Sequence, residues 1–171
     1  MKKFFAPRLY EDSIFDIDIA ALKKEGIKGF IFDIDNTIVS YDTPLPTKEV
    51  EDWFKTLEKE GFVSYIASNN KGGRVTLFSK GLKIPYLPKA KKPLPGNLKK
   101  ICASMGILPC ETAMVGDQLF TDMLGGNLAG MYPILIKQVS ENEGRFIKFK
   151  RIFEKIILPK KKREKYRRKV C

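Results

Sequence analysis

Hydrophobic and polar positions along the chain follow two alternating patterns that predict its secondary structure. Short, mostly apolar runs typical of buried strands occur at 27–35, 62–70, 84–87, 112–118 and 132–136. Segments with helical spacing or helix-end signals lie at 13–26, 46–61, 72–82, 95–107 and 119–130. Strands that alternate with helices favour right-handed crossovers and a parallel sheet. The sequence therefore predicts an α/β fold with a central parallel sheet covered by helices on both faces.

Polar residues follow the first four predicted strands, at the point where each strand ends. In strand order they are Asp33 and Asp35, Ser68 and Asn69, Lys91 and Lys92, and Asp117 and Asp122. Ligands of parallel sheets bind beyond the carboxyl ends of the strands, so we expect these side chains to meet at one edge. Each motif alone is also typical of a turn, a helix cap or a solvated surface. Their joint order at successive strand ends favours a functional site.

The residue types at this edge restrict its chemistry. Several carboxylates close together repel one another and require a cation or a shared proton. The chain has no histidine, which excludes an imidazole base, His–zinc ligation and a Ser–His triad. Oxygen ligands without His or Cys favour Mg²⁺, which commonly binds substrate phosphate as well. A lysine and the Ser68 hydroxyl would complete a site for a phosphoryl group.

Two aspartates at this spacing suit phosphoryl transfer in a protein without histidine. In an extended strand, Asp33 and Asp35 face the same side. One carboxylate can attack phosphorus and form an aspartyl-phosphate. The other can protonate the leaving oxygen and then deprotonate water. The sequence thus predicts a phosphomonoesterase that works through a covalent intermediate.

Four short motifs resemble those of the haloacid-dehalogenase (HAD) superfamily of phosphohydrolases. They are FDIDNT, YIASNN, KKP and VGDQLFTD, in this order. The opening PRLYEDSIFDIDIAALKKEGIKG and the run GDQLFTDMLGGNLAGMYPILI also resemble the YqeG-like branch of the subclass III phosphatases. The resemblance extends over residues 5–158 and implies a Rossmann-like, HAD-type three-layer sandwich. That branch includes phosphatases of phosphatidylglycerophosphate, a phospholipid precursor.

The resemblance implies roles for the four aspartates. Asp33 would be the nucleophile and Asp35 the general acid and base. Mg²⁺ would be bound by Asp33, by Asp117 and by the backbone carbonyl of Asp35. Asp122 would orient this metal shell.

The resemblance also implies the residues that bind the phosphoryl group. Ser68 and Asn69 would contact the phosphoryl oxygens. Lys92 would stabilise them and the aspartyl-phosphate. Lys91 is the other candidate for this contact, and the adjacency of Pro93 favours Lys92.

The intervals between the motifs leave no room for a cap domain. One loop, one helix and one strand fill 37–68, and a short helix and a short strand fill 68–92. An uncapped site admits large or surface-held phosphates, and the substrate or a partner must then exclude water. We therefore expect one uncapped phosphatase domain over residues 1–158.

Positive charge is concentrated near the C-terminus. The formal net charge is +12, and residues 159–171 contain eight Lys or Arg and one Glu. We expect this polybasic tail to be disordered and to attract polyanions. In 146–158, apolar residues fall on one helical face, with Lys and Arg over much of the rest. Such an amphipathic helix can lie on an anionic membrane through 146–169 or pack on its own domain, and the sequence leaves both open.

The sequence thus favours a Mg²⁺-dependent phosphatase, with a phospholipid head group such as phosphatidylglycerophosphate as one substrate. A soluble phosphometabolite or a phosphoprotein is the alternative. A different class, an RNA-binding or assembly factor that uses the basic tail, also stays open.

No apolar run approaches the roughly 18 residues that span a bilayer, and residues 1–10 lack the apolar core of a signal peptide. We expect a cytoplasmic protein, with peripheral contact to the inner face of the membrane if 146–169 bind lipid.

Overall fold

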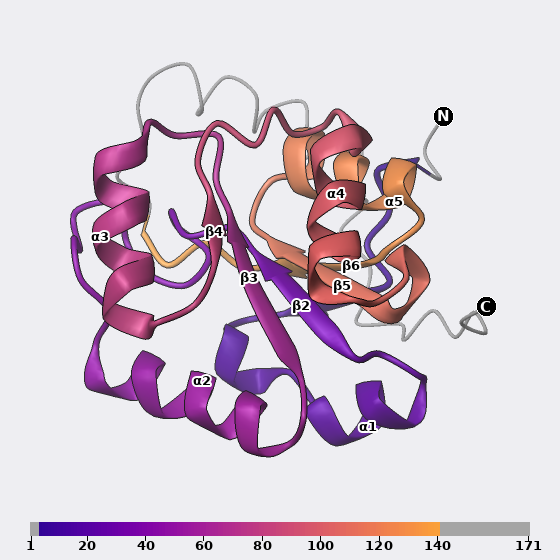
Figure 1. The fold of residues 1–171 in the computed structure, drawn as a ribbon, viewed down its shortest axis with the longest axis horizontal. Coiled ribbons are helices and arrows are strands. Elements are labelled where there is room, and N and C mark those ends of the chain that lie inside the picture. The colour runs from indigo at the N-terminus through magenta and orange to yellow at the C-terminus, as the bar shows by residue number, and fades with distance from the viewer. Residues whose placement is uncertain (1–3, 141–171) are drawn as a thin grey trace.

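Six parallel strands form a single sheet in the middle of the molecule (Figure 1). The structure is a computed structural model that describes residues 4–140. The strands are β1 (Leu9–Glu11), β2 (Gly29–Phe32), β3 (Val63–Ala67), β4 (Tyr86–Leu87), β5 (Thr112–Gly116) and β6 (Tyr132–Ile136). They lie in the order β1-β6-β5-β2-β3-β4, and all neighbours are parallel. The predicted α/β fold with a central parallel sheet is confirmed.

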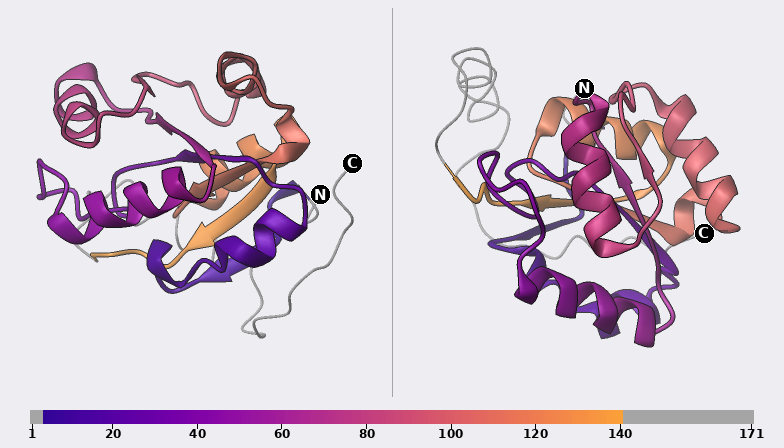
Figure 2. Two further views of the ribbon diagram at one scale, coloured as in Figure 1. Left: turned by 60° about the horizontal axis from the view of Figure 1, so that its bottom comes forward. Right: turned by 60° about the vertical axis from the view of Figure 1, so that its left-hand side comes forward.

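Helices cover both faces of the sheet, as the two views in Figure 2 show. They are α1 (Ile19–Lys24), α2 (Lys48–Lys59), α3 (Gly72–Leu82), α4 (Pro95–Met105) and α5 (Leu124–Ala129). Short 3-10 turns lie at Ile14–Asp16 and Pro109–Glu111, and a π-helical turn at Leu119–Met123 leads into α5. One apolar cluster joins α1, α2 and α3 to one face of the sheet, and a second joins α4 and α5 to the other. The expected three-layer sandwich is therefore observed.

The central strand β2 is buried on both faces. Phe30 and Phe32 belong to the cluster under α2, whereas Ile31 belongs to the cluster under α4. The ring of Phe32 packs against Phe54 of α2, with 5.0 Å between the ring centroids. A strand covered on both sides requires apolar residues at every position, which explains the continuous run GFIF.

Two N-terminal features differ from the prediction. The segment 13–26 is not one helix, because Ser13 and Asp18 each accept a backbone N–H and so begin separate elements. The first is the turn Ile14–Asp16, and the second is α1. Strand β1 is not predicted, because three residues with two polar side chains show no strand pattern. It is formed by pairing with β6, which lies far along the chain.

The described part of the chain contains no inserted cap domain. A loop and α2 connect β2 to β3, and α3 connects β3 to β4. The loops after β3 and β4 form the upper edge of the molecule in Figure 1. The predicted amphipathic helix at 146–158 and the basic tail at 159–171 lie outside the described residues, so the bounds of the domain stay a prediction. No helix within residues 4–140 is long and apolar enough to cross a bilayer.

Candidate active site

The carboxyl end of β2 positions the first aspartate. Phe30, Ile31 and Phe32 are fully buried, and Asp33, which follows them, is only 6% exposed. The Asp33 amide donates to the carbonyl of Val115 on β5 over 2.9 Å, so the pairing of the sheet extends to this residue. Apolar packing and backbone pairing together hold the Asp33 carboxylate at the carboxyl end of β2.

A buried lysine lies between two of the carboxylates. The Lys92 side chain is 1% exposed, and its Nζ lies 3.0 Å from Asp33 Oδ1 and 2.7 Å from Asp122 Oδ1. The neighbouring Lys91 is exposed. The Asn69 side chain binds the Lys92 backbone twice, because its Nδ2 donates to the carbonyl over 2.9 Å and its Oδ1 accepts from the amide over 2.8 Å. Of the two candidate lysines, the structure therefore places Lys92 in the acidic cluster.

The loop after β5 brings the other two carboxylates to the same point. The Thr37 hydroxyl donates to Asp117 Oδ1 over 3.3 Å, and the Gln118 amide donates to Asp122 Oδ2 over 3.1 Å. Gly116 permits this arrangement, because a Cβ at that position would overlap the Asp122 carboxylate. The glycine of the VGD motif is thus required for close packing around Asp122.

Three buried carboxylates and one ammonium determine the electrostatics of the cluster. Asp33, Asp117 and Asp122 each offer an oxygen within 4.8 Å of the other two. Burial raises the pKa of Asp33 to about 7, although Lys92 acts to lower it. Burial opposes the charge of Lys92, but Asp122 and Asp33 outweigh this effect and raise its pKa above the usual value. The net negative charge and the oxygen-only donors fit a hard divalent cation such as Mg²⁺.

Asp35 has different surroundings from Asp33. Its Oδ1 lies 2.7 Å from Arg74 Nε, and its Oδ2 accepts from Asn70 Nδ2 over 2.5 Å. Arg74 also donates from Nη2 to the Ser40 carbonyl over 2.9 Å, and its guanidinium lies 5.2 Å from the centroid of the Tyr41 ring. Both side chains of the ion pair keep some exposure, 13% for Asp35 and 19% for Arg74. Asp35 is therefore held beside the acidic cluster, at a more open position.

The sequence reasoning did not identify Arg74. The signal available was its position shortly after the SNN motif, in the first turn of the following helix α3. Ser68, at the end of β3, is 1% exposed, and its Oγ accepts from the Asn70 amide over 3.1 Å. Contact of Ser68 or Asn69 with a phosphoryl group stays a prediction.

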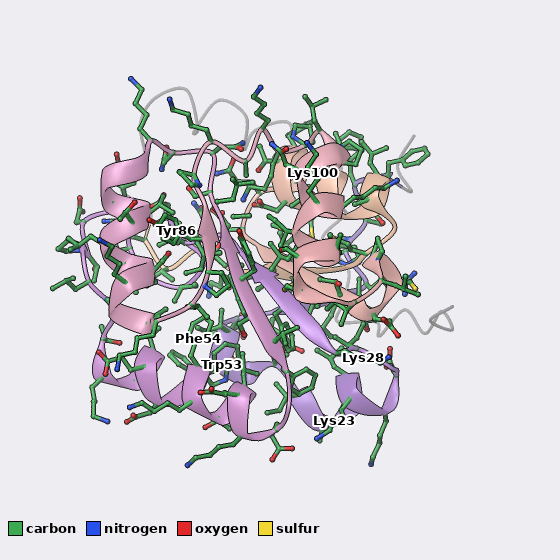
Figure 3. The ribbon with its side chains drawn as sticks, in the orientation of Figure 1. Lys23, Lys28, Trp53, Phe54, Tyr86 and Lys100 are labelled. Carbon is green, nitrogen blue, oxygen red and sulfur yellow. The ribbon has the colours of Figure 1, made fainter. Side chains whose placement is uncertain are left out.

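All the predicted site residues lie at one edge of the sheet. Asp33, Asp117, Asp122 and Lys92 form the buried cluster, and the other predicted residues surround it. Figure 3 shows the side chains of the molecule in the orientation of Figure 1, with this edge at the top. The roles assigned to these residues stay predictions.

Comparison with known proteins identifies the family. A family model described as HAD-hydrolase-like matches residues 89–149. The probable phosphatase YqeG of Bacillus subtilis (strain 168) is 38% identical over 164 residues, which span 96% of this chain and 95% of that protein. The chain belongs to the YqeG family of HAD-superfamily phosphatases. This confirms the family resemblance seen in the four motifs.

More distant relatives of this YqeG-family chain include a lipid phosphatase. Phosphatidylglycerophosphate phosphatase 1 of Chlamydomonas reinhardtii, a chloroplast protein, is 30% identical over 148 residues. The match covers 78% of this chain and 53% of the relative, so the chain spans about half the length of that protein.

Solved structures share the fold of this YqeG-family chain. The cobalt-bound deoxy-D-mannose-octulosonate 8-phosphate phosphatase of Haemophilus influenzae matches with a TM-score of 0.54 at 14% identity, over 79% of this chain and 89% of that one. A protein of Xanthomonas campestris, XCC2798, matches with a TM-score of 0.55 at 17% identity, over 78% and 75% of the two chains. At these identities the likeness concerns the fold alone.

Proposed function

We propose that this chain is a Mg²⁺-dependent phosphomonoesterase that works through an aspartyl-phosphate on Asp33. The observation that carries the proposal is the buried Lys92 ammonium between Asp33 and Asp122, with Asp117 beside them. A lysine held there can neutralise phosphoryl oxygens as they approach the nucleophile. No other cluster of acidic, His or Cys residues with metal-binding geometry occurs within residues 4–140.

The proposed reaction has two steps that use both aspartates. First, an Asp33 oxygen bonds to phosphorus while the bond from phosphorus to the leaving oxygen breaks, and Asp35 gives its proton to that oxygen. Second, water attacks the aspartyl-phosphate, its proton passes to Asp35, and the bond from phosphorus to Asp33 breaks. Inorganic phosphate is released, and both aspartates return to their starting states.

The remaining residues of the site would support charge and geometry. Lys92 and the Ser68 hydroxyl would bind the phosphoryl oxygens. Mg²⁺ would be held by Asp33, Asp117 and the Asp35 carbonyl, where it would neutralise the carboxylates and the phosphoryl charge. Asp122 would hold Lys92 in place, since both of its oxygens have partners in the protein.

We further propose a phospholipid head group, such as that of phosphatidylglycerophosphate, as the substrate. Two observations support it. The described part of the chain has no cap domain inserted between the strands that carry the site, and a relative with 30% identity is named as a phosphatidylglycerophosphate phosphatase. The alternative substrate is a soluble phosphometabolite or a phosphoprotein, and the test must distinguish it from a phospholipid.

The test is phosphate release from a panel of substrates that includes phosphatidylglycerophosphate in vesicles, sugar phosphates and p-nitrophenyl phosphate. We expect release in Mg²⁺, loss with EDTA, and recovery when Mg²⁺ is restored. Asp33→Asn should abolish release, whereas Asp42→Asn, the same change at an exposed loop position, should not. Full turnover by Asp33→Asn would contradict the mechanism, and preference for soluble substrates would contradict the lipid assignment alone.

A further inference from the structure

We propose that the surface surrounding the active site docks directly on an anionic lipid membrane. We call this surface the rim and define it by six exposed residues: Tyr41, Leu94, Val139, Lys71, Lys89 and Lys91. The inference rests on the proposed function, because it states where the substrate is held during the reaction. It assigns the contact to the folded domain, independently of residues 141–171.

The rim residues lie on four loops that are joined around the site. These loops follow β2, β3, β4 and β6, so all leave the sheet at its carboxyl edge. The Lys89 amide donates to the Asn70 carbonyl, and the Val139 amide donates to the Asn36 carbonyl, each over 3.2 Å. Tyr41 packs against the arginine that holds Asp35. These contacts connect the loops that carry the rim residues, at the edge of the sheet where the acidic cluster lies.

The rim exposes large apolar side chains beside a strongly polar site. Leu94 is 63% exposed, Tyr41 55% and Val139 53%. Single exposed apolar residues are ordinary on a soluble protein, but apolar groups around a charged site are typical of a contact surface. Leu94 also immediately precedes α4, where a serine or aspartate would cap the helix better, and it makes no capping bond.

The lysines of the rim have no acidic partner in the described part of the chain. Lys71, Lys89 and Lys91 form no ion pair with any residue in the range 4–140. Figure 3 shows side chains with terminal nitrogen atoms that project from the upper edge. Exposed lysines beside exposed apolar groups match a surface of anionic head groups over acyl chains.

Charge also disfavours the chain's own C-terminal sequence as the occupant of the rim. Residues 141–171 contain thirteen Lys or Arg and four Glu, so they repel the rim lysines. A nucleic acid would complement the charge, but two of the three apolar side chains of the rim, Leu94 and Val139, are aliphatic and cannot stack on bases as Tyr41 can. A lipid surface accommodates both the lysines and the aliphatic groups.

Docking through the rim has a consequence for catalysis. The head-group phosphate would reach Asp33 without leaving the bilayer surface, and the membrane itself would exclude water from the uncapped site. It would thus take over the role that a cap domain plays over an enclosed site.

The test compares two triple variants of the full chain. The rim variant carries Lys71→Gln, Lys89→Asn and Leu94→Ser. Asparagine tolerates the positive φ of 50° at position 89, and serine suits the start of α4. The control variant carries Lys24→Gln, Lys59→Gln and Leu108→Ser at exposed positions of the opposite edge, with the same loss of charge and apolar surface. Neither variant changes a residue placed in the catalytic site.

Binding is measured by sedimentation with vesicles of phosphatidylglycerol and phosphatidylcholine in equal parts, and with phosphatidylcholine alone. The unmodified protein should bind only the anionic vesicles, and high salt should weaken the binding. The two lysines alone should contribute about 30-fold to the partition coefficient, so the rim variant should lose at least this factor. The control variant should bind like the unmodified protein, and all three should hydrolyse p-nitrophenyl phosphate equally.

Equal vesicle binding by the rim variant and the unmodified protein would overturn the proposal. An unmodified protein that does not bind anionic vesicles would also overturn it. So would a rim variant whose binding to immobilised RNA falls while its binding to vesicles is unchanged. Failure of the proposed function would appear elsewhere, as absence of phosphate release from p-nitrophenyl phosphate. The vesicle measurement is readable in that case too, because it requires no turnover.

Discussion

Asp33 and Asp35 are the same residue type two positions apart, yet the fold gives them opposite surroundings. Asp33 is buried beside the Lys92 ammonium and two further carboxylates. Asp35 is more open and is held by Asn70, in the loop after β3, and by Arg74 of α3. The first position suits a nucleophile, which needs fixed geometry and neutralised charge. The second suits a proton carrier, which must reach both the leaving group and water.

The largest difference should appear when each aspartate is changed to asparagine. Asp33→Asn should lower kcat by at least about 10⁴-fold, because the attacking atom is lost. Asp35→Asn keeps that atom, and the leaving group of p-nitrophenyl phosphate departs as p-nitrophenolate, which needs no proton. An aspartyl-phosphate should therefore form, and it should accumulate because the base that activates water is lost. Rapid quench of ³²P-labelled substrate on the protein measures the intermediate. Label on Asp33→Asn, or none on Asp35→Asn, would remove the distinction between the two roles.

Removal of the Lys92 ammonium should affect Asp33 and the buried carboxylates around it. Lys92→Met leaves three carboxylates without their cation, which should cost about 3–5 kcal/mol of unfolding free energy and most of the activity. Urea unfolding measures the stability, and added Mg²⁺ should restore part of it. Lys91→Met is the matched control, since this neighbour is exposed, and it should leave both quantities near their native values. Equal effects of the two changes would contradict the placement of Lys92.

Replacement of the Arg74 guanidinium should affect Asp35, the more exposed of the two aspartates. Arg74→Lys keeps the charge but loses the paired contacts with Asp35 and the Ser40 carbonyl. We expect kcat to fall about 10- to 100-fold, because a misplaced acid or base transfers protons poorly. The midpoint of Mg²⁺ binding should stay unchanged, since Arg74 does not contact the buried cluster. A fall in Mg²⁺ affinity of the same size would show that the two aspartates are not independent.

The smallest expected effect concerns pH. The pKa of Asp33 in the folded protein, about 7, lies above its reference value of 3.8. The protonated group therefore stabilises the metal-free fold below pH 4, and this contribution is lost as the pH rises through 7. Between about pH 5.5 and pH 8 the loss should be about 2 kcal/mol, or several degrees in Tm.

Thermal unfolding of the metal-free protein at these two pH values tests this expectation. Asp33→Asn serves as the reference, because its side chain does not titrate. Mg²⁺ should raise the Tm of the unmodified protein more at the higher pH, where Asp33 is ionised. A difference between the two proteins that does not change with pH would contradict the raised pKa.

The sequence allowed much of the sheet to be predicted, and the reason is packing. Strands buried on both faces, such as β2 and β5, need continuous apolar runs, and these are visible without a structure. Thr47 caps α2, and Gly61, with φ of +83°, follows the end of that helix, as their residue types indicate. Strand β1 could not be predicted in this way, because its pairing partner lies more than a hundred residues away.

The acidic cluster was also predictable, because parallel strands bring their carboxyl ends together. The detail within it was not. Whether Lys91 or Lys92 turns inward depends on the bonds between Asn69 and the Lys92 backbone, which form only in the folded chain. The contact between Arg74 and Asp35 likewise joins residues 39 positions apart, and the sequence does not show that the two side chains meet. Long-range side-chain contacts of this kind can be identified only from the three-dimensional structure.

The strand order has a consequence for synthesis on the ribosome. β1 is made first, but its partner β6 is made last, with Leu9 opposite Ile134. Until that strand emerges, the nascent chain has an unpaired N-terminal segment and a sheet that ends at β5. The catalytic strand β2 has both of its neighbours earlier, since β3 and β5 precede β6. The inner strands can thus assemble before the N-terminal segment has a pairing partner. The sheet is complete only when the first and the last of its strands pair.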